Sequence, residues 1–229
     1  MGFRLYEEFK TIEEGKTWGE KYYMAWCKRI IDDPKVLTCN HQDKANPDND
    51  YSFTETKLSI FHAYMGNSAK QFINPSLRNQ CITEFENFYI SNLAESLDLA
   101  PKLDRNIVVY RFVNRDIAEQ IEKSSRFNKF TEKGFLSTSL TKNRSRKYDT
   151  DLVLLKIYLK KGSIGAYIEP LDNRGLEQEF LIQKGSKLWK KKKIKQQQLI
   201  ATSLLNSPSF KIDLLECYCI TNKHHHHHH

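Results

Sequence analysis

Apolar side chains in the first third of the chain recur at the spacing of helices. Between residues 5 and 32 they return every three or four positions, and Asp33-Pro34 ends the pattern. This periodicity predicts one long helix. Residues 38–52 contain the run Asn46-Pro47-Asp48-Asn49-Asp50, and we expect a loop there because these residue types favour turns.

Two more helices are expected before residue 105. The first begins at a Ser52 or Thr54 cap and ends at Gly66, since hydroxyl side chains favour the start of a helix and glycine favours its end. Residues 72–78 contain a proline and are expected to break the helical pattern. The next helix runs through Phe85, Phe88, Tyr89 and Leu93.

Beyond Pro101 the pattern changes to short runs of β-branched and aromatic residues, which are typical of strands. Residues 114–126 are expected to form a short helix. The expected strands are residues 107–113, 134–141, 152–159, 163–168, 187–194, 198–204 and 210–220. The sequence therefore predicts an α+β protein with a mainly helical part over about residues 1–105 and a mainly strand part over 106–223.

Polar side chains in two of these strands are candidates for a binding site. Arg111 lies in the middle of an apolar strand, where an arginine has to face a ligand, a carboxylate or water. Alternation along a strand places Ser137 and Ser139 on one face and Thr138 on the other. Small hydroxyls suit a bound sugar or amide, although a partly exposed strand with hydrogen-bonded hydroxyls has the same pattern.

Two carboxylates stand at the entrance of a buried strand formed by residues 180–182. Glu177 and Glu179 are separated by one residue, so on an extended strand they point to the same face, about 7 Å apart. Two acids at this separation suit a reaction in which one stabilises a developing cation and the other accepts a proton. The spacing is also common on solvated strand faces, so the pair acquires meaning only from its partners.

Composition restricts the function classes. Six of the eight histidines are the C-terminal run 224–229, an expression tag, and the five cysteines lack zinc-type spacing. We therefore expect free thiols and no metal. No apolar run is long enough to span a membrane, and no secretory signal is visible. The net charge of +8 indicates an acidic partner: an anionic cofactor, an acidic protein face, nucleic acid or a membrane surface.

Taken in order, Arg111, the run Ser137-Thr138-Ser139 and the pair Glu177-x-Glu179 resemble the mono-ADP-ribosyltransferases of the arginine-serine-glutamate class. The segment Ile73-Asn74-x-x-Leu77-Arg78 extends the resemblance to the clostridial C3-like and binary-toxin enzymes, so that it covers roughly residues 55–220. The resemblance implies an ADP-ribosyltransferase-like fold, in which N-terminal helices precede two packed, mainly antiparallel sheets around an NAD cleft.

The resemblance also implies roles for individual residues. Arg111 would bind the phosphate or ribose of NAD, and Arg78 would hold the pyrophosphate, through charge-assisted bonds. Ser137 would orient Glu179 and support the nicotinamide ribose. Glu179 would accept the ribose 2′-hydroxyl and stabilise the oxocarbenium ion as nicotinamide departs. No metal is required. The other residues expected to bind NAD are Phe112, Thr138, Ser139 and Arg144.

Two loops and one residue complete the expectations from the family. Residues 169–177 would form the target-recognition loop, and residues 141–150 would lie beside the NAD phosphates and nicotinamide. Phe112 departs from the pattern of the class, which typically has glycine after the strand arginine. The recognition loop also lacks an aromatic residue that many toxins carry in its first turn.

The first residue of the glutamate pair indicates which side chain accepts the ADP-ribose. In this class a glutamate there accompanies modification of arginine, so Glu177 implies an arginine acceptor on a target protein. A guanidinium is a poor nucleophile until a carboxylate takes a proton from it. Two alternatives remain: NAD glycohydrolysis on the same fold, and a basic, non-catalytic module that binds nucleic acid or an acidic protein through Lys190 to Lys193.

The resemblance and the composition together set expectations about organisation. We expect a single domain over residues 1–223, because no linker rich in Gly, Ser or Pro divides the chain. We also expect a monomer without a stable nucleic-acid partner. The protein is expected to be a secreted or injected bacterial effector that acts in the cytoplasm of a host cell.

Overall fold

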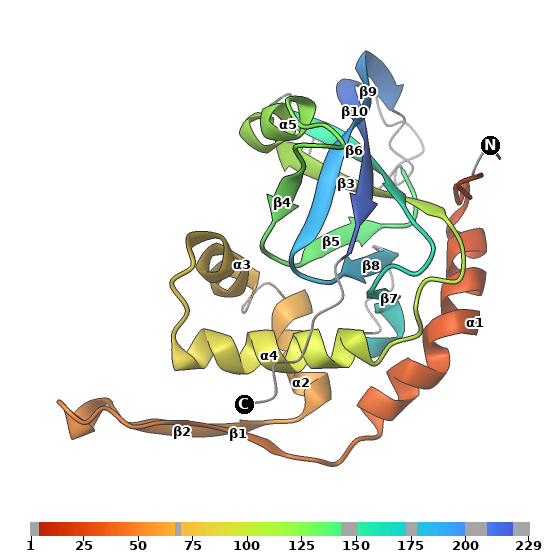
Figure 1. Ribbon diagram of the computed structural model, residues 1–229. Helices are drawn as coiled ribbons and strands as arrows, with labels where there is room; N and C mark the ends of the chain where they lie inside the picture. Colours follow the sequence, from red (N-terminus) through yellow and green to blue (C-terminus); the bar gives the residue numbers. More distant parts are fainter. Residues whose placement is uncertain (1–4, 67–69, 143–150, 173–177, 200–209, 222–229) are drawn as a thin grey trace.

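The helices gather in the first half of the chain and the strands in the second. The computed structural model describes residues 5–66, 70–142, 151–172, 178–199 and 210–221 (Figure 1). The helices are α1 Ile12–Ile31, α2 Lys57–Met65, α3 Lys70–Asn79, α4 Glu84–Asp98 and α5 Arg115–Glu122. The strands are β1 Leu37–His41, β2 Tyr51–Glu55, β3 Ile107–Asn114, β4 Phe130–Glu132, β5 Leu136–Ser139, β6 Leu152–Leu159, β7 Gly165–Tyr167, β8 Glu179–Ile182, β9 Ser186–Leu199 and β10 Phe210–Ile220. The predicted α+β class is confirmed.

The main sheet has eight strands in the order β4-β9-β10-β6-β3-β5-β8-β7. Its strand pairs are antiparallel except for β10 with β6. β3 and β5 meet at one residue pair, Tyr110 with Ser139. The sheet is therefore divided into a five-stranded half and a three-stranded half, which corresponds to the two sheets expected from the family.

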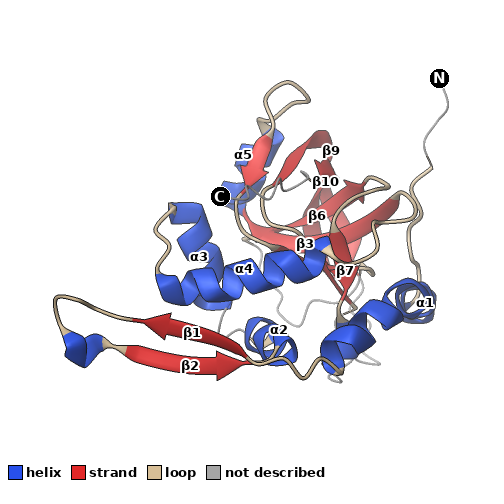
Figure 2. Cartoon of the chain, turned by 60° about the horizontal axis from the view of Figure 1, so that its bottom comes forward, coloured by secondary structure: helices blue, strands red, loops and turns tan. Residues whose placement is uncertain are grey.

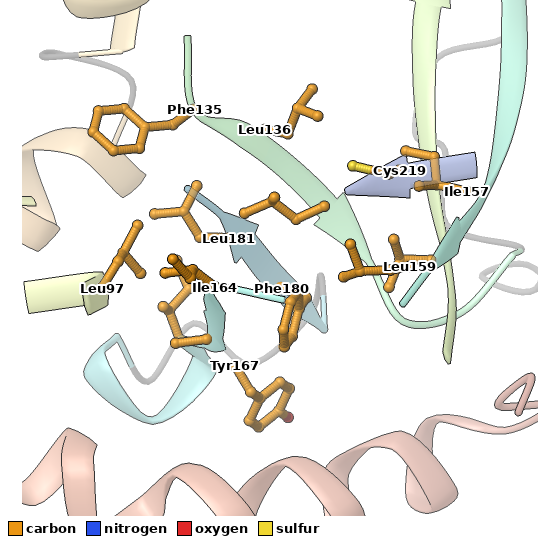
Figure 3. Packing of buried hydrophobic residues seen from close by; sticks show 14 of the residues in the cluster. Leu97, Phe135, Leu136, Ile157, Leu159, Ile164, Tyr167, Phe180, Leu181 and Cys219 are labelled. Carbon is orange, nitrogen blue, oxygen red and sulfur yellow. The ribbon is translucent and has the colours of Figure 1, made fainter. Parts of the chain in front are cut away.

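Helix α1 packs against the three-stranded half of the sheet. Phe180 of β8 packs against the rings of both Trp18 and Tyr23, at centroid distances of 6.1 and 5.8 Å. Tyr167 of β7 points towards α1 (Figure 3), and a Cβ at Gly19 would lie 2.4 Å from its ring. Only glycine allows the helix to approach so closely, so this position sets how near α1 lies to β7, the strand that pairs with β8.

The predicted start of the first helix was wrong. The first helix begins at Ile12 and not at residue 5, because the Thr11 side chain accepts a hydrogen bond from the backbone N–H of Glu14 and caps the helix there. Residues 5–10 run extended instead, and the backbone of Glu7 bonds to Asn106 and Val108 beside β3.

The loop predicted over residues 38–52 is largely a hairpin of β1 and β2 that projects from the body of the molecule (Figure 2). Turn-forming residues occupy only its tip, where Pro47–Asn49 form a 3-10 turn. Phe53 on β2 contacts Phe85 and Phe88 of α4, and this long-range packing selects the strand. Because residues 51–55 are in β2, helix α2 is capped by Thr56 rather than by Ser52 or Thr54.

The break predicted at residues 72–78 does not occur, since α3 continues through Pro75. The helix is anchored by the two residues just before the proline. Ile73 is fully buried, and the Asn74 side chain donates to the Tyr64 hydroxyl and accepts from the backbone N–H of Phe135. These tertiary contacts outweigh the hydrogen bond that proline removes.

Three strand predictions also need correction. The strand expected over residues 134–141 is shorter, Leu136–Ser139. The segments 187–194 and 198–204 were expected as separate strands, but β9 runs without interruption from Ser186 to Leu199. Residues 200–204 lie outside the described residues. The four lysines 190–193 lie within β9, where Lys193 pairs with Glu122 and Lys191 lies 3.9 Å from Glu216.

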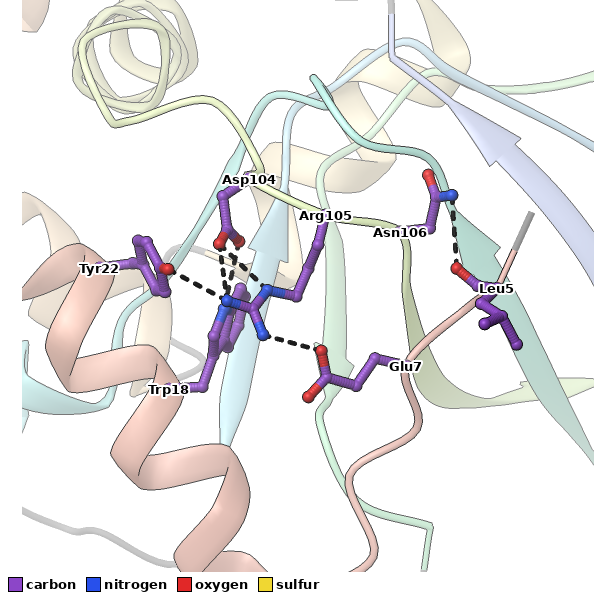
Figure 4. Close-up of polar contacts among 7 residues, drawn as sticks. All are labelled: Leu5, Glu7, Trp18, Tyr22, Asp104, Arg105 and Asn106. Atoms are coloured by element: carbon purple, nitrogen blue, oxygen red, sulfur yellow. Dashed lines mark hydrogen bonds and ion pairs between the residues drawn. The ribbon is translucent and has the colours of Figure 1, made fainter. Parts of the chain in front are cut away.

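The N-terminal segment, α1 and the approach to β3 are joined by one arginine (Figure 4). Arg105 donates to Asp104, Glu7 and the Tyr22 hydroxyl, at distances of 2.8 to 3.0 Å. Trp18 also donates to Asp104. This cluster connects three parts of the chain that share no secondary structure.

Replacing Arg105 by alanine should destabilise the protein by about 2 kcal/mol, because it leaves three acceptors without their donor. The melting temperature should fall by roughly 2–4 °C for each kcal/mol. Thermal unfolding measures this. Lys57→Ala is the control, since it removes one ion pair with Asp33 at 3.3 Å and should cost less than about 0.5 kcal/mol. Equal losses in the two variants would contradict the role assigned to Arg105.

The Asp104 carboxylate should make stability depend on pH. Burial alone would raise its pKa, but hydrogen bonds from Arg105, Tyr22 and Trp18 outweigh burial and hold the pKa below its usual value. Its contribution is therefore present above the ordinary carboxyl pKa of about 4 and is lost as pH falls through the lowered value. Urea unfolding should show a larger penalty for Asp104→Asn at pH 7 than at about pH 3. A penalty independent of pH would disprove this.

Candidate active site

Three neighbouring strands bring the predicted polar residues together. β5 lies between β3 and β8, with Tyr110 opposite Ser139 and Ser139 opposite Glu179. A cavity of about 190 Å³ opens at this junction. Its lining residues include Arg111, Phe112, Ser137, Ser139, Lys142 and Glu179. The junction of the two half-sheets is therefore the candidate site.

Ser137 and Glu179 are in direct contact. The Ser137 hydroxyl donates to Glu179 Oε2 at 2.8 Å, and Glu179 is only 4% exposed. The backbone carbonyl of Ser137 accepts a 2.8 Å hydrogen bond from Arg111 Nη1. One residue of β5 thus holds both the carboxylate and the guanidinium in place.

The hydroxyls of β5 divide between the two faces, as strand alternation predicts. Ser137 and Ser139 are half-buried on the cavity side. Thr138 is buried, and its hydroxyl donates to the backbone carbonyl of Phe180 at 2.6 Å. The Thr138 side chain therefore ties β5 to β8, while the serines remain beside the cavity.

Arg78 reaches the site from α3. Its Nε and Nη2 both donate to Glu132 Oε1, at 2.9 and 2.6 Å, and the Glu132 side chain is only 6% exposed. A second cavity, of about 170 Å³, is lined by Arg78, Arg111 and Glu132, among others. Arg111 and Phe112 line both cavities, so the two spaces share a wall.

The charge balance at the site favours an anion. Burial lowers the pKa of Arg111, and the negative charges of Glu132 and Glu179 act in the opposite direction. An arginine keeps its charge under any ordinary condition. Burial also lowers the pKa of Lys142, against the attraction of Glu8. Arg78, Arg111 and Lys142 therefore supply positive charge around the two cavities.

Glu177 and Arg144 lie outside the described residues, as do most of the two expected loops. The structure nevertheless corrects the geometry assumed for the glutamate pair. β8 begins at Glu179, and Gln178 has a φ of 48°. The separation of about 7 Å assumed an extended backbone through this residue, so that premise was wrong.

Gln178 is itself a well-anchored residue. It is 2% exposed, its side-chain oxygen accepts from the Tyr167 hydroxyl, and its carbonyl accepts from the N–H of Leu140. A left-handed conformation costs a non-glycine residue about 1–2 kcal/mol, and these contacts offset that cost. The turn before Glu179 is thereby held in one conformation.

Two further carboxylates at the site were missed by the sequence reasoning. Glu169 is buried in the turn after β7, and its Oε1 accepts the backbone N–H of Glu179 at 2.7 Å. Glu132 fixes Arg78. Only their burial distinguishes them from surface acids, and no local pattern in the sequence encodes it.

The described ranges contain no group of three His, Cys, Asp or Glu side chains arranged to hold a metal ion. The described cysteines are free thiols, as predicted. In the same part of the chain, every helix is too short or too polar to cross a membrane.

Comparison with known proteins points to one family. A family profile described as ADP-ribosyltransferase exoenzyme matches residues 15–211. Comparison with curated protein sequences found no match.

Several solved structures share the fold. The ADP-ribosylating toxin BECa of a binary enterotoxin of C. perfringens, solved with NADH, is 18% identical with a TM-score of 0.67, and the match covers 94% of this chain but 50% of that one. Plx2a, an ADP-ribosyltransferase toxin from Paenibacillus larvae, is 18% identical with a TM-score of 0.63, over 93% and 99% of the two chains. The Clostridium limosum C3 exoenzyme is 18% identical with a TM-score of 0.60, over 95% and 98%.

The chain thus spans half the length of BECa and nearly all of Plx2a and the C3 exoenzyme. The profile match extends from α1 into β10 and includes all the strands of the candidate site. This protein belongs to the ADP-ribosyltransferase exoenzyme family and has the ADP-ribosyltransferase-like fold.

Proposed function

We propose that the protein is a mono-ADP-ribosyltransferase that takes ADP-ribose from NAD, releases nicotinamide, and transfers the ADP-ribose to an arginine side chain of a protein. The observation that supports this most directly is the hydrogen bond from Ser137 to the buried Glu179 beside Arg111. A serine, a carboxylate and a guanidinium in this arrangement suit the departure of a cationic leaving group from a ribose.

The residues around the two cavities fit NAD as the donor. Guanidinium groups bind phosphate oxygens through paired hydrogen bonds, and Arg78 and Arg111 share one cavity. Hydroxyl and carboxylate groups suit a ribose, and Ser137, Ser139 and Glu179 line the other. Because Arg111 borders both, the two cavities together match an elongated, anionic dinucleotide.

Phe112 is compatible with this assignment. Its side chain packs partly against a second hydrophobic cluster that includes Val108 and Leu154. The family pattern assigns the backbone of Phe112 the role of the glycine found in the class, which is to hold the nicotinamide amide. Thr138 contributes through the pairing of β5 and β8, and Arg144 is assigned to the phosphates by the family pattern alone.

Glu179 is assigned the central chemical role. As the C–N bond between ribose and nicotinamide breaks, its electron pair leaves with nicotinamide, and positive charge develops on the ribose. A fixed carboxylate beside that charge stabilises the transition state without reorganising. The bond from Ser137 and the bond from the Glu179 N–H to Glu169 provide this fixed position.

The acceptor assignment rests on Glu177. A new C–N bond forms between the ribose and a guanidine nitrogen, and the guanidine proton must pass to a base. Glu177, one residue before the left-handed Gln178, is assigned as that base, and residues 169–177 are assigned to recognition of the protein.

We also propose a setting and a domain organisation. The similar structures include toxins, which supports a secreted or injected effector that acts in a host cell. One hydrophobic core joins α1, α4 and the main sheet, which supports a single domain over residues 1–223. We expect it to act as a monomer.

Replacing Glu179 by glutamine should lower NAD hydrolysis by at least about a thousandfold, because it removes the charge that stabilises the transition state. Ser137→Ala should cost roughly tenfold to a hundredfold, since one hydrogen bond to a charged group contributes about 1.5–3 kcal/mol. The measurement is release of nicotinamide from labelled NAD. Ser91→Ala, an exposed hydroxyl on α4, should have no effect. Full activity of Glu179→Gln would refute the assignment.

Glu177→Gln should abolish transfer to agmatine, a small guanidine, and leave most NAD hydrolysis intact, because only the acceptor loses its base. Labelled agmatine and free ADP-ribose are counted in one assay. Equal loss of both activities would contradict the division of roles. Free ADP-ribose without labelled agmatine in the wild type would favour NAD glycohydrolysis.

A further inference from the structure

A large hollow in the described part of the protein lies away from the candidate active site. It is a groove of about 970 Å³ on the face of β6, β9 and β10. Four aromatic side chains line it: Tyr6, Tyr158, Trp189 and Tyr218. Four basic side chains line it as well: Arg126, Lys129, Lys160 and Lys191. None of its described lining residues is acidic.

The basic residues of this aromatic-basic groove are poorly neutralised. Arg126, Lys129 and Lys160 form no ion pair with any carboxylate in the described ranges, and Lys191 lies 3.9 Å from Glu216. Lys193 of the same strand, in contrast, is paired with Glu122 at 3.0 Å. The groove therefore presents several cations whose counter-charge has to come from solvent or from a partner.

An exposed apolar side chain follows the lining residue Arg126 in the sequence. Phe127 is 95% exposed and lies in the turn between Arg126 and Lys129. Large apolar side chains that are exposed beside a groove are typical of protein interaction surfaces. The groove combines this apolar anchor with aromatic walls and positive charge.

The aromatic rings are arranged for a polypeptide rather than for stacked bases. Lys129 lies over the Trp189 ring at 5.2 Å and Lys191 over the Tyr158 ring at 4.8 Å. Tyr218 packs against both of these rings. Single-stranded nucleic acids need open ring faces on which bases stack, whereas here ammonium groups cover the faces of two rings.

The groove continues the face that carries the candidate site. Leu154 of β6 lines the cavity with Ser137 and Glu179, and Tyr158 of the same strand lines the groove. Strand alternation puts both side chains on one face, about 13 Å apart. Lys156 lies between them and is held by Glu8 and Glu216, at 3.3 and 3.8 Å. A partner in the groove thus reaches the site without crossing an edge of the sheet.

We propose that the aromatic-basic groove binds an acidic segment of the protein substrate and so directs an arginine of that substrate to the candidate site. The cations pair with acidic side chains, while the aromatic walls and Phe127 accept apolar ones. The identification of the bound polypeptide as the substrate rests on the proposed function, whereas the binding of an acidic polypeptide to the groove is independent of that function.

Trp189 provides a direct readout. The chain has three tryptophans, and Trp18 and Trp26 are buried in the core. A twelve-residue peptide of Glu and Tyr should change the fluorescence of the protein, and Trp189→Phe should remove the change without removing binding measured by calorimetry. A matched peptide with Gln in place of Glu should bind at least about tenfold more weakly.

A pair of charge-matched variants separates the groove from general charge attraction. The triple variant Arg126→Gln, Lys129→Gln and Lys191→Gln should weaken binding of the acidic peptide about tenfold. The control triple variant changes Lys16, Lys28 and Lys44 to Gln, which are all exposed on α1 or the hairpin, and should weaken it less than about twofold. Equal weakening by both triple variants, or no binding by the wild type, would overturn the proposal.

Two further outcomes are decisive. If a twelve-residue oligothymidine binds more tightly than the acidic peptide and depends on the same three residues, the occupant is nucleic acid and the proposal fails. NAD hydrolysis should be the same in both triple variants, since neither touches the candidate site. Absence of NAD turnover in the wild type would refute the proposed function. The fluorescence titration would still show whether the groove binds an acidic peptide.

If the protein turns over NAD and the groove binds the acidic peptide, an acidic peptide that carries one arginine should be modified with a lower KM than its Gln-substituted counterpart. The triple variant Arg126→Gln, Lys129→Gln and Lys191→Gln should remove that difference in KM. Loss of kcat without a change in KM would contradict a docking role.

Discussion

The structure depends on a narrow connection between two halves of one sheet. β3 and β5 share a single residue pair, Tyr110 with Ser139, so the ladder of backbone hydrogen bonds is nearly broken there. Strands that separate leave backbone groups unpaired, and a buried unpaired carbonyl is costly. The guanidinium of Arg111 meets the carbonyl of Ser137 at this point. Arg111 is thus part of the connection, and its remaining donors are left for a ligand.

Helices hold the two half-sheets in position, since the strand pairing between them is short. α1 packs on the three-stranded half through Phe180 and Tyr167, and α3 is tied to the turn before β5 by Asn74 and to β4 by Arg78. Each half-sheet is therefore positioned by helical packing as much as by strand pairing. The residues of the candidate site come from separate elements, and their distances depend on all of these contacts.

Sequence reasoning succeeded where local periodicity carries the information. Arg111 stands out as a charged residue in an apolar run, and Ser137 stands out because hydroxyls alternate with leucines there. The structure brings these two residues into contact. Sequence reasoning failed where distant contacts decide. Phe53 is part of a strand because it packs against Phe85 of α4. The charge of Glu132 contributes to the site because Arg78 donates a hydrogen bond to it. The start of α1 differs for a local reason, since the Thr11 side chain caps the helix at a position that apolar periodicity alone does not mark.

The left-handed backbone at Gln178 separates the strand that carries Glu179 from the chain before it. On an extended strand the directions of residues 177 and 179 are the same, so a change at one affects the placement of the other. Here Glu179 is held within the sheet by Ser137 and Glu169, and the turn at Gln178 is held by Tyr167 and Leu140. Chain changes before Gln178 therefore leave the carboxylate in position.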